Sequence, residues 1–575
     1  MKIFNKFKKK KDILNYPWEK YYKPEDRNIE VPDISIYDYF EKSCFNRMDE
    51  IALNYFGVKM TFKELVDNID LCSKAYRCYG VRSGDVISIC MPNTPEALIS
   101  FYAANKIGAI VNFIHPLSSE EEIKDTLIKT KSVFLIAINI SYDKIVNVLD
   151  KTDVYKTIIV SAKNYMPPLL KFGYSVFQEK NINLPKSSEK YLYWYDFISR
   201  GKSYEHNCFV QRSMNDDAVY LHSGGTTGTP KNIVLTNGNF NAIIEQAKIV
   251  FPDLGIGDKL LGILPLFHCF GLIVSICAPL TLGSTIVLIP QFDAKRFDKL
   301  IRKYEPSVLT GVPTLYEALI TNPYMINVDL SATKYVVCGG DSLSPERNKA
   351  VNDFLASHNS KCSVTQGYGM TETSGPSSFG FGDSAKLGSV GIPLPGNVFK
   401  IFDINTYEEM KPGEIGEICI SGPSVMSRYL DNKEETDNMI KLHEDGIRWV
   451  HTGDLGYMDE DGVIFFVQRL KRMLIVSGYN VYPAHIEKVL LEHPKIKDCG
   501  VIGVPHPYKV QVPKAYIVLK KGVEYDRGFI KELKEYCNKK LAKYMIPKEF
   551  VVRDELPKTL VGKVNYKELE KENTK

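Results

Sequence analysis

Residues 220–231 hold a dense cluster of groups that can bind an anion. The segment reads YLHSGGTTGTPK, and its candidate residues are Ser223, Gly224, Gly225, Thr226, Thr227, Gly228, Thr229 and Lys231. Glycines let backbone N–H groups approach an anion closely, and a lysine adds a compact positive charge for a phosphate. The spacing differs from the P-loop pattern GxxxxGK[ST], because Pro230 precedes the lysine and Asn232 follows it. The segment therefore predicts a phosphate site outside the ordinary P-loop class.

Two shorter segments carry groups that suit the rest of a nucleotide. Residues 365–373 read TQGYGMTET, where Tyr368 lies between two glycines and can offer its ring to a flat ligand. Glu372 in the same segment is a lone carboxylate of the kind that holds Mg²⁺ together with phosphate oxygens and waters. Residues 450–457 read VHTGDLGY, and Asp454 is a candidate acceptor for ribose hydroxyls. Taken alone, either segment also fits ordinary turn chemistry.

Taken together and in this order, the three segments resemble those of the adenylate-forming superfamily. That superfamily contains acyl- and aryl-CoA synthetases, firefly luciferase and the adenylation domains of peptide synthetases. Residues 469–487, RLKRMLIVSGYNVYPAHIE, resemble its hinge and CoA-tunnel motif, and residues 557–564, PKTLVGKV, resemble its catalytic-lysine motif. The resemblance extends from about Ser35 to Leu569. It implies an AMP-forming acid–thiol ligase that uses ATP, Mg²⁺ and coenzyme A.

The resemblance also implies a role for each matching residue. The phosphate-binding set is the segment 223–231 named above, and the adenine set is Gly339, Gly340, Tyr368 and Gly369. Thr371 would contact the α-phosphate, Glu372 the Mg²⁺, and Asp454 the ribose, with Arg469 nearby. The remaining implied roles are the catalytic lysine, the hinge, the pantetheine tunnel and the acyl pocket, for Lys563, Lys471, Gly478 and His268 respectively.

Four positions depart from the family pattern without removing a catalytic group. Asn232 stands where glycine is common, Gln468 where Gly or Asp is common, and Arg472 where an acidic residue is common. Asp341 stands where aryl-CoA ligases often have alanine. It could face the acyl pocket, or it could serve the turn before a helix that Ser344 caps.

The predicted reaction activates a carboxylic acid as acyl-AMP with release of pyrophosphate, and then transfers the acyl group to coenzyme A. Residues 309–319, LTGVPTLYEAL, and the sequence GGDSLSPE resemble bacterial fatty-acyl-CoA synthetases, and the pocket segments are largely apolar. An apolar pocket gains about 0.8 kcal/mol per buried methylene, so a medium- or long-chain fatty acid is the favoured substrate. The alternatives are an aryl, bile-acid-like or amino acid substrate, an enzyme that does not use CoA, and a non-catalytic binding protein.

The elements that must position these residues change character along the chain. Apolar runs such as 86–92 and 132–138 alternate with helical patterns such as 93–110, which indicates an α/β fold with parallel sheets covered on both faces. After Gly388 short alternating strands indicate a barrel-like β subdomain, and after Arg469 a small, mobile α+β domain follows. The predicted parts are a basic tail at 1–34, an AMP-binding domain at 35–468 and a C-terminal domain at 469–575.

The composition indicates which kinds of partner and which cellular compartment to expect. With 73 Lys and Arg against 69 Asp and Glu, the net charge of +4 gives no reason to expect nucleic acid as a partner. The 12 cysteines lack metal-ligand spacing, and no apolar run follows the basic start MKIFNKFKKKKD, so a cytoplasmic location is expected. The start is either a solvated tail or a peripheral contact with the inner membrane face. Residues 260–292 lack charge and predict a buried helix followed by a core strand, with membrane insertion as the alternative.

Overall fold

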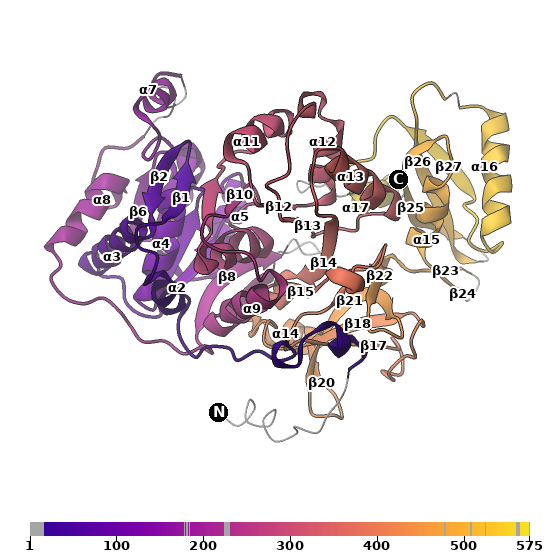
Figure 1. Ribbon diagram of the computed structural model, residues 1–575, viewed down its shortest axis with the longest axis horizontal. Helices are drawn as coiled ribbons and strands as arrows, with labels where there is room; N and C mark the ends of the chain where they lie inside the picture. The colour runs from indigo at the N-terminus through magenta and orange to yellow at the C-terminus, as the bar shows by residue number, and fades with distance from the viewer. Residues whose placement is uncertain are drawn as a thin grey trace. The chain divides into compact units, whose positions relative to one another are not determined.

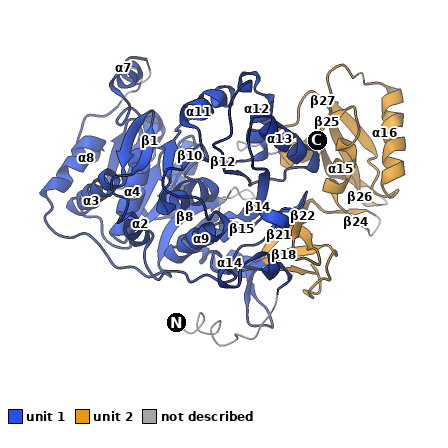
Figure 2. Cartoon of the chain, viewed as in Figure 1, with its two compact units in different colours: residues 1–398, 420–450 blue, residues 399–419, 451–575 orange. Residues whose placement is uncertain are grey.

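The computed structural model describes residues 16–177, 179, 182, 184–223, 231–476, 479–506, 509–523, 525–558 and 564–573 (Figure 1). The chain divides into two compact units, residues 1–398 with 420–450 and residues 399–419 with 451–575 (Figure 2). The first unit is a large body of mostly parallel sheets and helices, and the second is a smaller α+β body. The predicted hinge near residue 468 lies inside the second unit, and a domain boundary there remains a prediction.

An eight-stranded sheet holds the phosphate-loop strands. Its order is β19-β9-β8-β4-β3-β5-β6-β7. The strands are β3 (Val86–Cys90), β4 (Ile110–Phe113), β5 (Ser132–Ile138), β6 (Lys156–Val160), β7 (Tyr191–Tyr193), β8 (Asp217–Ser223), β9 (Lys231–Thr236) and β19 (Arg428–Tyr429). All pairs from β8 to β7 are parallel, whereas β9 runs antiparallel to both β8 and β19. Strands β3 and β6 are buried along their whole length, as the continuous apolar runs predict.

A nine-stranded sheet holds the TQGYGMTET segment. Its order is β16-β15-β14-β13-β12-β10-β11-β1-β2. The strands are β1 (Ile51–Tyr55), β2 (Val58–Thr61), β10 (Lys259–Gly262), β11 (Thr285–Leu288), β12 (Val308–Gly311), β13 (Tyr335–Cys338), β14 (Val364–Met370), β15 (Gly375–Phe379) and β16 (Ile392–Pro393). Its central pairs are parallel, and β14 turns back antiparallel into β15.

Helices of the first unit connect and cover these strands. They are α2 (Ile36–Cys44), α3 (Phe62–Cys78), α4 (Pro95–Lys106), α5 (Glu120–Lys129), α6 (Tyr142–Val146), α7 (Pro168–Phe177), α8 (Trp194–Arg200), α9 (Asn237–Val250), α10 (Ala278–Leu282), α11 (Phe297–Tyr304), α12 (Pro313–Thr321), α13 (Pro345–Ser357) and α14 (Lys433–Met439). Helix α4 is buried throughout, because it lies among the sheet, α2 and α3. Ser344 caps α13, as predicted, by accepting the N–H of Arg347.

The uncharged stretch 260–292 is buried, as predicted. It begins with β10, continues through a π-helix (Phe270–Cys277) into α10, and ends in the core strand β11. Among the described residues no helix is long and apolar enough to cross a membrane. The π-helix packs tightly at Gly271, where a Cβ atom would lie 2.1 Å from the carbonyl oxygen of Pro265.

The later part of the chain is built mainly on antiparallel strands, as its pattern predicts, although β26 and β27 are parallel. One sheet has the order β17-β18-β21-β20 with β22 beside β21, and a second has the order β24-β23-β26-β25 with β27 beside β26. The strands are β17 (Val398–Phe402), β18 (Gly416–Ser421), β20 (Ile440–Leu442), β21 (Arg448–Met458), β22 (Ile464–Arg469), β23 (Leu474–Val476), β24 (Tyr479–Val481), β25 (Ile496–His506), β26 (Val510–Leu519) and β27 (Glu549–Arg553). The helices α15 (Pro483–Leu491), α16 (Arg527–Lys540) and α17 (Tyr566–Lys571) complete the second unit.

Glu96 is an ionisable group inside the core of the first unit. It lies in the first turn of α4 with 1% of its surface exposed, and its Oε1 has no hydrogen-bond partner among the described residues. Burial raises its pKa from 4.5 to about 7. The unfolded chain releases this proton at lower pH than the folded chain, so raising the pH from 4.5 to 7 makes Glu96 destabilise the fold.

We therefore expect Glu96→Gln to raise the free energy of unfolding by about 3 kcal/mol above pH 7, and by less than about 1 kcal/mol near pH 5. Urea unfolding of both proteins at the two pH values measures the difference. Glu346→Gln is the matched control, because Glu346 also follows the first proline of a capped helix but is exposed. A gain that is equal at both pH values would contradict the assignment.

Candidate active site

The phosphate segment connects two paired strands of the eight-stranded sheet. Strands β8 and β9 are antiparallel, and Ser223 pairs with Lys231 in the last rung before the connection. Gly224, Gly225, Thr226, Thr227, Gly228 and Thr229 lie outside the described residues, as does the side chain of Ser223. Their phosphate contacts therefore remain predictions, and Lys231 is the member of the set whose surroundings the structure gives.

Lys231 lies against a carboxylate and an aromatic ring. Its Nζ is 2.5 Å from Oε2 of Glu435 and 4.9 Å from the ring centroid of Tyr429. Tyr429 is placed by the pairing of β19 with β9, and Glu435 by α14, whose first turn is capped by Asn432. A phosphate at Lys231 would have to compete with the Glu435 carboxylate. Neither Tyr429 nor Glu435 lies in a segment that was predicted from the sequence to belong to the site.

Tyr429 connects Lys231 to the predicted metal ligand. Its hydroxyl donates a 2.9 Å hydrogen bond to Oε1 of Glu372, which is 7% exposed. Burial, followed by the Glu372 charge, raises the pKa of Tyr429, so the hydroxyl stays protonated and can donate. The structure thus brings Lys231, the predicted phosphate lysine, to the ring of Tyr429 and Glu372 to its hydroxyl. A carboxylate beside neutral hydroxyls fits Mg²⁺, which usually takes phosphate oxygens and waters as further ligands.

The segment that contains His268 packs against Thr371 in the TQGYGMTET segment. The thiol of Cys269 donates to Oγ1 of Thr371 at 3.7 Å, which places half-buried His268 one residue away from this contact. Burial raises the pKa of Cys269 to about 11, so this thiol is neutral. The structure therefore brings the predicted acyl-pocket histidine near the predicted α-phosphate ligand, and it also supplies Cys269, which the sequence did not single out.

The predicted adenine set lies at the ends of two neighbouring strands, β13 and β14. A Cβ atom at Gly339 would lie 3.3 Å from the ring of Phe270, and Gly340 has a left-handed φ of +77°. A Cβ atom at Gly369 would lie 1.7 Å from the carbonyl oxygen of Gly375, so only glycine fits there. Tyr368 directly precedes Gly369 in β14 and is half-buried.

Asp454 and Arg469 face each other inside the second unit. They pair across β21 and β22, with 3.4 Å between Arg469 Nε and Asp454 Oδ1. The backbone of β21 before Asp454 is held by Glu417, whose carboxylate lies 2.8 Å from Nδ1 of His451 and accepts the N–H of Gly453 at 2.9 Å. Sequence reasoning missed Glu417, although its strand was predicted.

The hinge segment has partners on both sides within the second unit. Lys471 lies in a short 3-10 helix (Leu470–Arg472). The guanidinium of Arg472 is 2.6 Å from Oε1 of Glu487 and 3.6 Å from the ring centroid of Tyr566. Gln468, buried on the other side, accepts the N–H of Ala484 at 3.2 Å. Gly478 and Lys563 lie outside the described residues.

The unusual Asn232 has a half-buried partner, His222. His222 has its Nδ1 2.9 Å from Oδ1 of Asn232 and its Nε2 2.8 Å from Oδ1 of Asn112, while the Asn112 amide donates to Ser88 at 2.7 Å. Burial lowers the pKa of His222, and the neutral ring can donate to only one of these two amide oxygens. This network holds the strand pair His222–Asn232, which lies next to the final pair before the phosphate segment. The departure from glycine at 232 was the only sequence signal for it.

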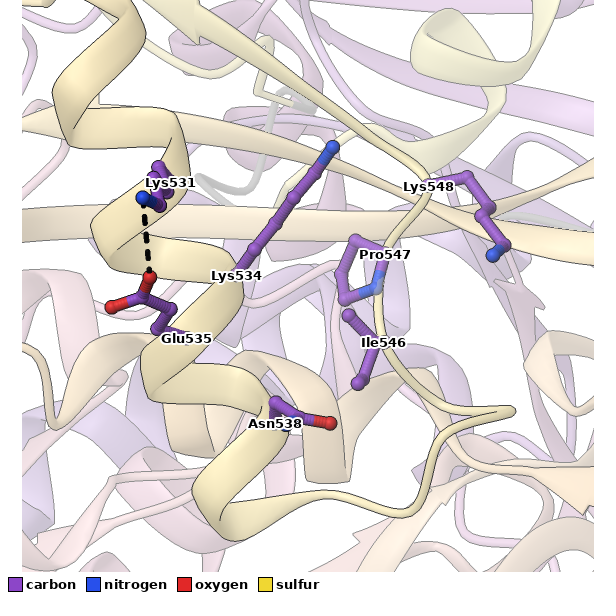
Figure 3. Close-up of a pocket in the computed structure, with 7 residues that line it drawn as sticks. All are labelled: Lys531, Lys534, Glu535, Asn538, Ile546, Pro547 and Lys548. Carbon is purple, nitrogen blue, oxygen red and sulfur yellow. Dashed lines mark ion pairs between the residues drawn. The ribbon is translucent and has the colours of Figure 1, made fainter.

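A hollow of about 360 Å³ on the second unit lies apart from these residues (Figure 3). It lies between α16 and the segment before β27, and its lining is Lys531, Lys534, Glu535, Asn538, Ile546, Pro547 and Lys548. Figure 3 shows that Lys531 turns toward Glu535 and that Lys548 points away from the helix. The cations do not converge, so we assign no ligand to this hollow.

Two family models match successive parts of the chain. Residues 40–430 match the model of the AMP-binding enzyme family, and residues 485–563 match the AMP-binding enzyme C-terminal domain. The chain belongs to the AMP-binding enzyme family. The resemblance to adenylate-forming enzymes is thereby confirmed, and so is the predicted α/β fold with a smaller C-terminal domain.

Individual relatives of the chain are named as CoA ligases, which is consistent with this family. A long-chain-fatty-acid–CoA ligase of Bacillus subtilis is 31% identical over 563 residues, covering 97% of this chain and 98% of the relative. A probable 4-coumarate–CoA ligase of Dictyostelium discoideum is 29% identical and covers 97% of this chain and 98% of the relative. The crystal structure of ATP-bound MatB from Rhodopseudomonas palustris shares the fold, with a TM-score of 0.80 at 24% identity and coverage of 93% and 98%. The acid–thiol ligase class predicted above is confirmed at this level.

Proposed function

We propose that this AMP-binding enzyme activates a medium- or long-chain fatty acid with ATP and transfers the acyl group to coenzyme A. The observation that supports the adenylation step is that Lys231 contacts the ring of Tyr429 while Glu372 accepts a hydrogen bond from its hydroxyl. Such a site offers a cation for the phosphates and a carboxylate for their counter-ion in one place. The acyl-CoA product and its chain length rest on the relatives named long-chain-fatty-acid–CoA ligases.

In this proposal the side chains of the enzyme position the substrates and neutralise the charge on the phosphates. The protein forms no covalent bond to the phosphoryl group in this step. Lys231 and the glycine-rich segment hold the β- and γ-phosphates, Tyr368 stacks on adenine, and Asp454 accepts the ribose hydroxyls. When bound at Glu372, Mg²⁺ would withdraw charge from the phosphate oxygens. Lys563 neutralises the junction between the carboxylate and the α-phosphate. Rotation of the C-terminal domain at Lys471 then admits the CoA thiol along Gly478.

A second candidate is activation of an aromatic acid. It is favoured by the relatives named probable 4-coumarate–CoA ligases, which match this chain at 29% identity over nearly its whole length. Bile-acid-like or amino acid substrates and an enzyme without a CoA step are further alternatives. The proposed location is the cytoplasm, with the lysine-rich residues 1–12 as a peripheral contact with an anionic membrane face.

The deciding experiment is pyrophosphate release over a panel of fatty, aryl, bile-acid-like and amino acids, each with and without CoA. We expect the highest kcat/KM with saturated acids of medium or long chain, and thioester product only when CoA is present. Equal pyrophosphate release in both conditions with no thioester would contradict the CoA step. A preference for aryl acids would contradict the fatty-acid assignment while leaving the adenylation site in place.

Replacing the Glu372 carboxylate by an amide should slow adenylation by about 10-fold and raise the Mg²⁺ concentration needed for half-maximal rate. Glu372→Gln keeps an oxygen that can accept the Tyr429 hydroxyl, so the fold should survive. Tyr429→Phe is the control: it removes that hydrogen bond, keeps the carboxylate, and should leave the Mg²⁺ titration nearly unchanged. If Glu372→Gln changes neither the rate nor the titration, the ion is held elsewhere.

A further inference from the structure

Helix α7 presents its apolar side chains to solvent. No residue of this helix is buried, and its sequence PLLKFGYSVF contains no acidic residue. Leu169 is 83% exposed, Phe172 70% and Phe177 80%, and Leu170 and Val176 are also exposed. Leu169, Phe172 and Val176 follow the three- and four-residue spacing that places side chains on one helical face. Figure 1 shows α7 at the periphery of the first unit, standing away from the sheets.

The polar side chains of α7 make the contacts with the rest of the unit. Lys171 lies over the ring of Tyr195 at 5.7 Å, and Ser175 accepts a hydrogen bond from Lys163 at 3.0 Å. Lys163 also pairs with Glu179 just beyond the helix. The helix is therefore attached by its polar side and turns its apolar side outward. Surface helices of globular proteins normally have the opposite orientation.

Leaving such side chains in water is costly, because burying one large apolar side chain is worth about 1.5–3 kcal/mol. A contiguous exposed patch of this kind marks an interaction surface. The charges around it limit the kind of partner. Residues 161–190 contain five lysines and two glutamates, and Lys186 in this stretch is exposed. Half-exposed Tyr195 beside the helix adds an aromatic ring with a polar end.

We propose that α7 is a membrane-surface helix that inserts Leu169, Phe172, Val176 and Phe177 into the outer part of an anionic lipid bilayer. Helices that lie in the interface plane combine an apolar face of Leu and Phe with nearby lysines. Here Lys163 and Lys190 are held in ion pairs, and exposed Lys186 is the lysine offered to the headgroups. Basic residues near the surface add attraction to anionic headgroups. The proposed enzyme would then be located at the membrane, into which long-chain acids partition. The helix itself is independent of which acid is activated.

The test is co-sedimentation of the full chain with vesicles of phosphatidylcholine and phosphatidylglycerol in equal parts, without substrates. We expect the wild-type protein to bind these vesicles, and Leu169→Glu/Phe172→Glu to lower the partition coefficient by at least about 10-fold. Lys186→Glu should weaken binding to the same vesicles, with a smaller effect at high salt. Leu442→Glu is the matched control, because Leu442 is 70% exposed in β20 and distant in sequence from α7.

A deletion of residues 1–15 separates this surface from the basic tail, and binding through α7 should persist in the shortened chain. Pyrophosphate release with a short, water-soluble acid should be equal in the wild type and the α7 variant, which checks folding and keeps the test independent of the proposed substrate. Absence of wild-type binding, or an equal loss in Leu442→Glu, would overturn the proposal. A wild-type dimer that Leu169→Glu/Phe172→Glu converts to a monomer without changing vesicle binding would identify α7 as a self-association surface instead.

Discussion

Lys563→Ala should slow acyl-AMP formation by at least about 100-fold while largely sparing thioester formation from added acyl-AMP. The expected loss follows from removing one cation at the carboxylate–phosphate junction, where negative charge spreads during attack on the α-phosphate. The structure describes both ends of the segment that carries it: Lys558 pairs with Val564, and the N–H of Asn565 donates to the carbonyl oxygen of Pro557 at 2.7 Å. Lys563 itself lies outside the described residues, between these two joined ends.

Lys558→Ala is the matched control, because this exposed lysine lies in the same sequence segment and pairs with Val564. It should leave adenylation within about 2-fold of the wild-type rate, as surface substitutions usually do. Both half-reactions are measured separately, as pyrophosphate release and as acyl-CoA formation from synthetic acyl-AMP. Wild-type pyrophosphate release by Lys563→Ala, or an equal loss in both half-reactions, would remove Lys563 from the proposed chemistry.

Lys471→Pro should affect the two half-reactions unequally, lowering the rate of one by about 100-fold and the rate of the other by less than about 10-fold. Domain rotation needs a φ or ψ change at a few residues, whereas proline fixes φ near −65° and restricts the residue before it. Lys471 lies between two residues that both contact α15, because Gln468 accepts the N–H of Ala484 and Arg472 pairs with Glu487. A pivot at Lys471 is therefore the prediction that this variant tests.

Lys471→Ala removes the ammonium group but keeps the backbone free, so it separates loss of charge from loss of rotation. We expect its two half-reactions to fall by similar, small factors. If pyrophosphate release survives in Lys471→Pro while thioester formation collapses, the adenylating orientation is trapped. The reverse division shows the other orientation, and a mild, equal loss in a folded Lys471→Pro protein would place the pivot elsewhere.

Several features of this chain were predictable from local pattern. The parallel sheets follow from apolar runs that strands such as β3 and β6 need when both faces are covered. The capped start of α13 follows from Ser344 and Pro345, since a side-chain oxygen and a proline suit the unpaired N–H groups of a first turn. The uncharged stretch 260–292 was predicted as buried, although the π-helix within it was not, because the sequence contains no signal for i to i+5 hydrogen bonding.

The departures from the family pattern show where local reasoning ends. Asn232 and Arg472 were visible as unusual residues, but their partners were not. Asn232 meets His222 because β8 and β9 pair in one particular register. Arg472 meets Tyr566, 94 residues later in the numbering of the chain, because both pack beside Glu487 in the second unit. A polar side chain needs a partner when it is buried, but which partner it obtains depends on strand pairing and packing far away in the sequence.

The sequence by itself determined the family, the order of the motifs and the residue types that adenylation requires, because glycine, hydroxyl, lysine and carboxylate chemistry is encoded locally. Only the tertiary structure decided that Tyr429 joins Lys231 to Glu372, that Glu435 competes for the same lysine, and that α7 turns its apolar side outward. The physical reason is the same in each case. These outcomes depend on burial and on contacts between distant segments, such as the two-residue strand β19 against β9, and no periodicity within one segment records them.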